Sequence, residues 1–62
     1  MAQLHAHEFL HLQEHIRSES AAAATYRSLA DQCQDPELKR FVETQAQLAE
    51  KTVQQLMGFL QR

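Results

Sequence analysis

The sequence predicts an all-α fold, an antiparallel hairpin of two long helices that pairs with a second copy into a four-helix bundle. Three observations lead to this prediction. Good helix formers dominate the 62 residues, whereas Gly and Pro occur once each. The single proline divides the chain near its middle. On both sides of it, apolar residues recur three and four positions apart, as they do in helices that bury one face.

The first predicted helix covers about residues 5–33. Its apolar side chains follow the three-and-four spacing, and they are Phe9, Leu12, Ile16, Ala23, Tyr26, Ala30 and Cys33. Glu19 interrupts this row at a position where an aliphatic residue is expected. Because a carboxylate is costly to bury unless it is paired or ligated, Glu19 is the main anomaly of the chain. The plainer interpretation places it at the edge of the row or bonded to a neighbour.

A turn at residues 34–35 follows from the segment Gln34-Asp35-Pro36-Glu37. Asp is a favoured N-cap residue, Pro is favoured at the first helical position, and an acid in the first turn suits the helix dipole. The residue before a proline resists helical geometry, so the first helix must end by about Cys33 or Gln34. A connection this short turns the second helix back antiparallel to the first.

The second predicted helix covers about residues 36–60. Its apolar stripe consists of Leu38, Val42, Ala49, Leu56 and Leu60, and it is widened on both sides by Phe41, Leu48, Val53, Met57 and Phe59. One partner helix cannot cover a stripe this wide, which favours two hairpins in a four-helix bundle. The residues expected in the core or interface are Phe9, Leu12, Ile16, Tyr26, Leu38, Val42, Leu56 and Leu60. A monomeric hairpin is the alternative.

Chain length also favours self-association. A chain of 62 residues buries little apolar surface by itself, and disulfides, metals or oligomerisation usually compensate. Cys33 is the only cysteine, so no intramolecular disulfide can form, and no zinc-type Cys/His cluster is present. We therefore expect a homodimer or a higher homo-oligomer.

Charge and motif content exclude several classes of function. The formal net charge is -2 and no basic block occurs, which argues against nucleic acid as a partner. No apolar run approaches the roughly 20 residues of a membrane span, and no secretory signal pattern is present. Phosphate loops, dinucleotide fingerprints and nucleophile elbows are absent too. We expect a non-enzymatic protein without a cofactor, in a reducing compartment such as the cytoplasm.

Three segments carry a family resemblance. They are the stretch from Glu8 to Glu19 with Tyr26 beyond it, the turn segment 30–39 and, more loosely, Ala46-Gln47 with Leu56. In these segments the chain resembles the spore coat protein F-like family of the ferritin-like, rubrerythrin-like class. The similarity covers nearly the whole chain and is most specific in the turn. It implies half of a ferritin-like bundle that a homodimer restores, other coat-type proteins as further partners, and a spore-associated location.

The resemblance also implies a metal site, which the residues match only in part. Glu19 corresponds to the first-helix carboxylate of metal-binding members. The second helix should supply an acid or His followed three residues later by His, but the inward pair expected level with Glu19 is Ala49 and Thr52. No Glu-x-x-His begins at Glu50 either. The dinuclear site is therefore expected to be lost, and the metal ligands that remain as candidates are Glu19, His15 and Glu50.

Histidines form a second candidate metal site. His7, His11 and His15 are spaced four apart, and helical neighbours at this spacing can chelate Zn, Ni or Cu. The preferred interpretation is a solvated flank with adventitious metal affinity. Gln45 and Thr52 fall near the centre of the second stripe and are expected to form a polar layer with Glu19.

Three functions remain open from the sequence. The first is a structural, self-assembling module. The second is a metal-binding or redox protein with a degenerate carboxylate site. The third is an adaptor whose apolar stripe captures a helix of another protein.

Overall fold

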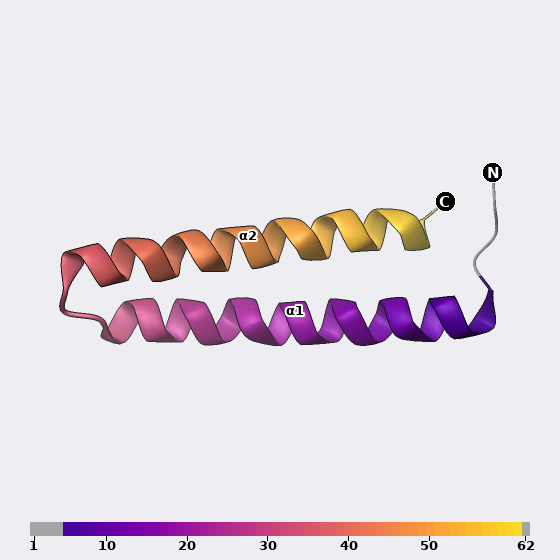
Figure 1. Cartoon of the computed structure of the whole chain (residues 1–62), viewed down its shortest axis with the longest axis horizontal. Helices are drawn as coiled ribbons and strands as arrows, with labels where there is room; N and C mark the ends of the chain where they lie inside the picture. Colours follow the sequence, from indigo (N-terminus) through magenta and orange to yellow (C-terminus); the bar gives the residue numbers. More distant parts are fainter. Residues whose placement is uncertain (1–4, 62) are drawn as a thin grey trace.

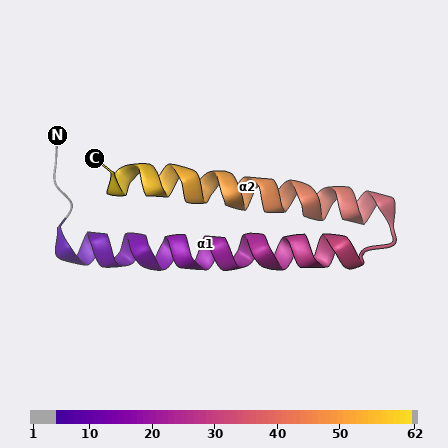
Figure 2. The same cartoon turned by 180° about the vertical axis from the view of Figure 1, so that it is seen from behind.

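The computed structural model describes residues 5–61, which form two α-helices packed against each other (Figure 1). Helix α1 covers Ala6–Gln32 and α2 covers Pro36–Leu60. The helices run antiparallel along a body of 46 × 17 × 11 Å, and no strand occurs among the described residues (Figure 2). The predicted all-α hairpin is confirmed.

Both ends of α1 are set by local hydrogen bonds. The His5 N–H donates to Glu8 Oε1 at 3.0 Å, and the His5 carbonyl accepts from the Phe9 N–H at 2.9 Å. At the other end, Cys33 takes an extended conformation (φ -74°, ψ 132°) and its N–H donates to the Ala30 carbonyl at 3.2 Å. His5 and Cys33 thus flank α1, which is one residue shorter at each end than the sequence predicted.

Asp35 begins α2 as its N-cap. Its Oδ1 accepts from the Glu37 N–H at 2.9 Å and from the Leu38 N–H at 3.5 Å, which satisfies amides that the first helical turn leaves without partners. Pro36 occupies the first helical position, where no N–H is needed. The N-cap predicted from the sequence is confirmed.

The two helices meet along a seam of small side chains. The buried residues are Ala23, Ala30, Val42, Ala46 and Ala49. Ala46, with 0% of its surface exposed, lies at the centre of the seam and was not among the predicted stripe residues. Gln45 and Thr52, which were predicted near the stripe's centre, are only half-buried. Ala23, Ala30, Val42 and Ala49 were in the predicted rows, and Ala46 joins them because close approach of the two backbones favours alanine between the helices.

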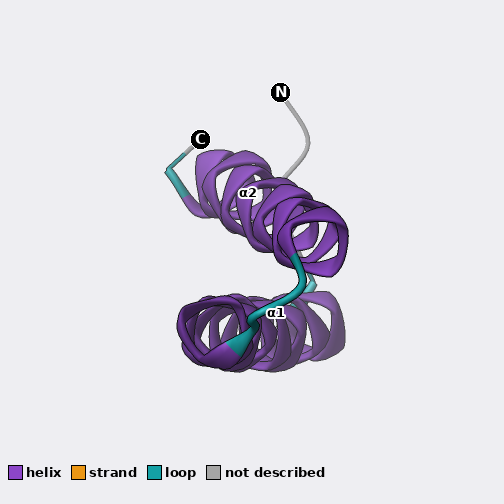
Figure 3. Cartoon of the chain, turned by 90° about the vertical axis from the view of Figure 1, so that its left-hand side faces the viewer, coloured by secondary structure: helices purple, strands orange, loops and turns teal. Residues whose placement is uncertain are grey.

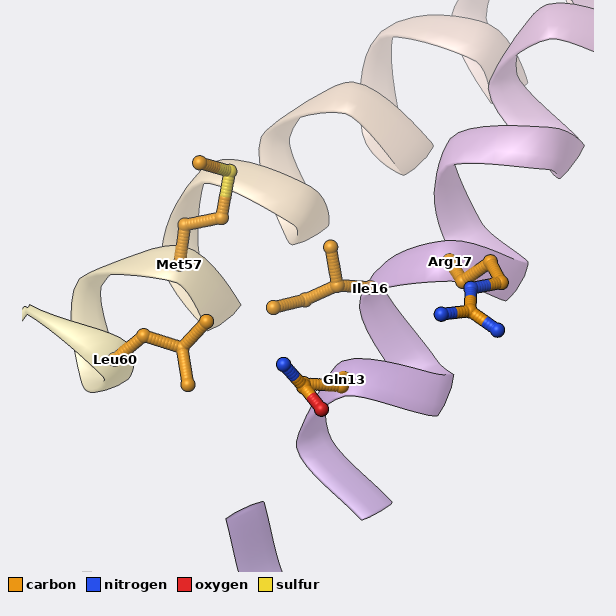
Figure 4. A pocket seen from close by; sticks show the side chains of 5 residues that line it. All are labelled: Gln13, Ile16, Arg17, Met57 and Leu60. Carbon is orange, nitrogen blue, oxygen red and sulfur yellow. The ribbon is translucent and has the colours of Figure 1, made fainter. Parts of the chain in front are cut away.

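The hairpin opens toward the end opposite the turn. There the larger residues Leu12, Ile16, Leu56 and Leu60 replace alanine and are only half-buried, and the helices lie farther apart (Figure 1). A hollow of about 370 Å³ remains between them, lined by Gln13, Ile16, Arg17, Met57 and Leu60 (Figure 4). The view along the hairpin shows one helix stacked on the other, with both flanks of the pair uncovered (Figure 3). In the single hairpin, the apolar residues at this end therefore stay partly exposed.

Candidate interaction surface

A second row of side chains runs along α2 beside the seam. Phe41 is 62% exposed and Leu48 is 53% exposed, and both lie in the row formed by Leu38, Phe41, Gln45, Leu48, Thr52 and Phe59. Their spacing of three, four or seven residues keeps them on one flank of the helix. Four of the six are large apolar residues, and all four are exposed.

Helix α1 carries a matching row. Ala22, Tyr26, Leu29 and Cys33 are spaced three and four apart, so they share one flank. Ala22, Tyr26 and Cys33 are half-buried, and Leu29 is 45% exposed. This flank adjoins the buried positions Ala23 and Ala30 and extends the apolar surface sideways from the seam.

An ion pair shows that both rows lie on the same side of the hairpin. Arg27 and Glu50 bridge the helices on one side of the seam. On α1, the buried Ala23 and Ala30 lie between the flank that carries Arg27 and the flank that carries Tyr26. On α2, the buried Ala49 lies between Glu50 and Leu48 in the same way, so Tyr26 and Leu48 project from the flanks opposite the ion pair. The two rows therefore form one surface, which we call the apolar face: Ala22, Tyr26, Leu29, Leu38, Phe41, Leu48 and Phe59.

The opposite side of the hairpin, which we call the charged face, is built around the Arg27–Glu50 pair. Arg27 Nη2 donates to Glu50 Oε1 at 2.7 Å and Arg27 Nε donates to Oε2 at 3.3 Å. The hydrogen bond and the charge of Glu50 raise the pKa of Arg27, and Glu43 and Asp31 add to this field. Arg27, Glu50 and the acids near them thus lie on one side of the seam, and five of the eight exposed large apolar residues that the structure describes lie on the other.

The exposed surface of the single hairpin is large for its mass. A compact chain of 7.2 kDa is expected to expose about 4100 Å². The chain exposes 5097 Å², an excess of about 1000 Å², to which its elongated shape contributes. In a standard protein interface each partner buries about 800 Å², so the excess is of the size that one partner would cover.

The residues predicted for the core or interface divide into three groups. Val42 is buried in the seam. Leu12, Ile16, Tyr26, Leu56 and Leu60 are half-buried. Phe9 is 41% exposed and Leu38 is 50% exposed, so neither belongs to the core of one hairpin. Leu38 lies in the first turn of α2 beside the connection, where half of its surface stays exposed, and it joins the apolar face instead.

The three candidate metal ligands do not form a cluster in one hairpin. Within residues 5–61, no group of three or more His, Cys, Asp or Glu side chains is placed to hold a metal ion. The Glu50 carboxylate is bonded to Arg27 on the charged face, eight residues along α1 from Glu19. His15 is exposed and lies on the other flank. Glu50 is thus paired with Arg27 and not with the other two candidates. A metal site that joins Glu19 to His15 would need further ligands from a second chain.

Glu19 lies in the row that faces α2, as the sequence indicated. It is half-buried, and among the described residues it makes no hydrogen bond or ion pair. The hydroxyl of Thr52 donates to its own helix, at the Leu48 carbonyl, over 3.0 Å. Thr52 therefore meets its hydrogen-bonding needs without Glu19, and the polar layer predicted from Glu19, Gln45 and Thr52 is not joined by a bond in the single hairpin.

The fold and its surface define a class, the two-helix α-hairpin with one charged face and one apolar face. No family model, curated protein or solved structure matches the chain. Neither α1 nor α2 combines the length and the hydropathy that crossing a membrane would require.

Proposed function

We propose that this protein is a non-enzymatic structural module that assembles with itself, two hairpins packing their apolar faces together into a four-helix bundle. The observation that carries the proposal is the apolar face. It gathers Phe41, Leu48 and three other exposed large apolar side chains on one side of the seam, with the Arg27–Glu50 pair on the other. A stacked pair of two-helix layers is the arrangement of a four-helix bundle.

A second copy of the chain is the occupant that best fits the apolar face. The surface excess of one hairpin is of the order that each partner buries in a standard interface. The self-complementary contact of a twofold dimer also leaves both charged faces in water. The resemblance of the turn segment to spore coat proteins adds support for an assembly role, and coat-type proteins and a cytoplasmic or spore-associated location belong to the same proposal.

The test is the oligomeric state of untagged protein with one charge placed on the apolar face. Leu48→Glu should weaken self-association by tenfold or more in Kd, because two carboxylates would be buried in the interface. Leu10→Glu is the matched control, since Leu10 is as exposed as Leu48 (61% against 53%) but lies outside the apolar face. Sedimentation equilibrium reports both constants, and far-UV circular dichroism reports helix content.

The results separate the proposed assembly from its alternatives. A wild-type monomer at all concentrations, or equal effects of Leu48→Glu and Leu10→Glu, would overturn it. Native mass spectrometry of the same sample reports bound metal. A dimer whose bound transition-metal ions are lost in Glu19→Ala would instead favour a metal-binding or redox protein with a carboxylate site. A hairpin that associates only with another protein would favour the adaptor.

A further inference from the structure

Three histidines form a row along the first turns of α1, apart from the seam. His7, His11 and His15 are all exposed and lie four residues apart in a continuous helix. Neighbours at this spacing have Cβ atoms about 5–6 Å apart, close enough for two imidazoles to bind one ion. His7 and His15 are eight residues apart, about 12 Å along the axis, and cannot share an ion.

The first turn of α1, where the histidine row begins, is held by hydrogen bonds. The bonds from His5 N–H to Glu8 and from Phe9 N–H to the His5 carbonyl establish that turn. His5 itself lies outside the row, because its backbone is extended (φ -73°, ψ 157°) and its ring stacks parallel to that of His7 at 6.1 Å. The chelating pairs are therefore His7 with His11, and His11 with His15.

The position of the row suggests what a bound ion would do. The first turn of α1 extends past the end of α2, so no helix packs against it in the hairpin (Figures 1 and 2). Phe9, which a partner helix would normally cover, is 41% exposed there. An ion bridging two turns would restrain this end of α1 where packing does not.

We propose that the histidine row binds one divalent transition-metal ion of the kind that prefers imidazole, such as Zn²⁺, Ni²⁺ or Cu²⁺, and that this ion clamps the N-terminal turns of α1. His11 belongs to both chelating pairs, so a chain holds one ion at a time. Water completes the coordination, since among residues 5–61 no third His, Cys, Asp or Glu is placed to join a site. Both ligands of each pair come from one helix, so a single chain can form the site.

The test is calorimetric titration of the untagged full chain with Zn²⁺ alone. We expect one ion per chain. His11→Ala should lower the affinity by tenfold or more, because it destroys both pairs and with them the high effective concentration of the second imidazole. His7→Ala and His15→Ala should each lower it only about twofold, because one of two equivalent pairs remains. His5→Ala should leave it unchanged.

Further measurements separate an effect on metal binding from an effect on folding or on self-association. All four positions are exposed, and alanine is the best helix former at the three helical ones, so circular dichroism should show intact helices in those variants, with a change confined to the first turn for His5→Ala. Zn²⁺ should slow amide hydrogen exchange in residues 8–15 of the wild type but not of His11→Ala. The Leu48→Glu chain should still bind Zn²⁺ and should still lose affinity on His11→Ala, because both ligands of each pair lie on one helix of one chain.

Three outcomes would overturn the proposal. Equal affinities of His11→Ala and the wild type would show that the row is not the site. Two ions per chain would show that the pairs do not share His11. Equal, large losses in His7→Ala, His11→Ala and His15→Ala would mean that the ion takes ligands from more than one chain.

Discussion

The guanidinium of Arg27 donates two parallel hydrogen bonds to the carboxylate of Glu50, from Nη2 to Oε1 at 2.7 Å and from Nε to Oε2 at 3.3 Å. The residues are 23 positions apart in the chain, and theirs is the only ion pair between the helices within residues 5–61. Both side chains are nearly half exposed, so the pair adds little stability by itself. Its value here is geometric, because it shows which flanks of α1 and α2 lie on the same side.

The pair makes a prediction about Glu50. The hydrogen bond from Arg27 lowers the pKa of Glu50 below its ordinary value of 4.5. A carboxyl with a lowered folded-state pKa stabilises the fold above its unfolded pKa, and this contribution is lost as the pH falls through the folded pKa. Arg27→Gln should return the Glu50 titration, followed by carboxyl NMR, to its ordinary range. Arg17→Gln, which leaves the pair intact, should not move it; equal titrations of Glu50 in wild type and Arg27→Gln would contradict the bidentate geometry.

The Asp35 cap predicts a loss of stability on truncation. Asp35→Ala removes the acceptor for the Glu37 and Leu38 amides and should cost about 1 kcal/mol in the free energy of unfolding. Asp35→Asn is the control, since Asn caps helices about as well as Asp. Urea denaturation measures both variants, and equal losses in the two would mean that charge at the helix dipole, rather than the cap bond, stabilises this end.

The alanine seam predicts intolerance of larger side chains. Ala46→Leu inserts three carbons where no surface is exposed and should cost about 1–3 kcal/mol in the free energy of unfolding, because the helices must move apart. Ala21→Leu makes the same chemical change at an exposed position of α1 and should alter stability by less than about 0.5 kcal/mol. If thermal denaturation finds Ala46→Leu neutral, the helices do not meet as closely as the buried alanines indicate.

Glu19 predicts a gain of stability. Its carboxylate is half-buried in the row facing α2 and has no bonded partner among the described residues. Glu19→Leu should raise the melting temperature by about 4–8 °C, equivalent to about 1 kcal/mol for a chain of this size. Glu14→Leu, at an exposed position of the same helix, is the control. A fall in melting temperature for Glu19→Leu alone would show that the carboxylate has a partner in the assembled protein.

The elements of the fold could be predicted because their causes are local. Asp35 and Pro36 act on amides within one turn of themselves, and the three-and-four spacing of apolar residues is a property of one helix at a time. The width of the second stripe was also visible, and Phe41 and Leu48 do remain exposed in the hairpin. Glu19 was recognised as an anomaly for the same reason, since its position in the row depends only on helical spacing.

By itself, then, the sequence determined two antiparallel helices, their bounds to within a residue, and an excess of apolar surface. Tertiary packing alone decided that Ala46 takes the centre of the seam, that Leu38 turns to the apolar face, and that Glu50 is bonded to Arg27. Periodicity specifies which residues share a stripe, but not how far each helix rotates about its axis or slides along its partner. Rotation and register are set by the closest fit of small side chains between the helices, which no single helix encodes.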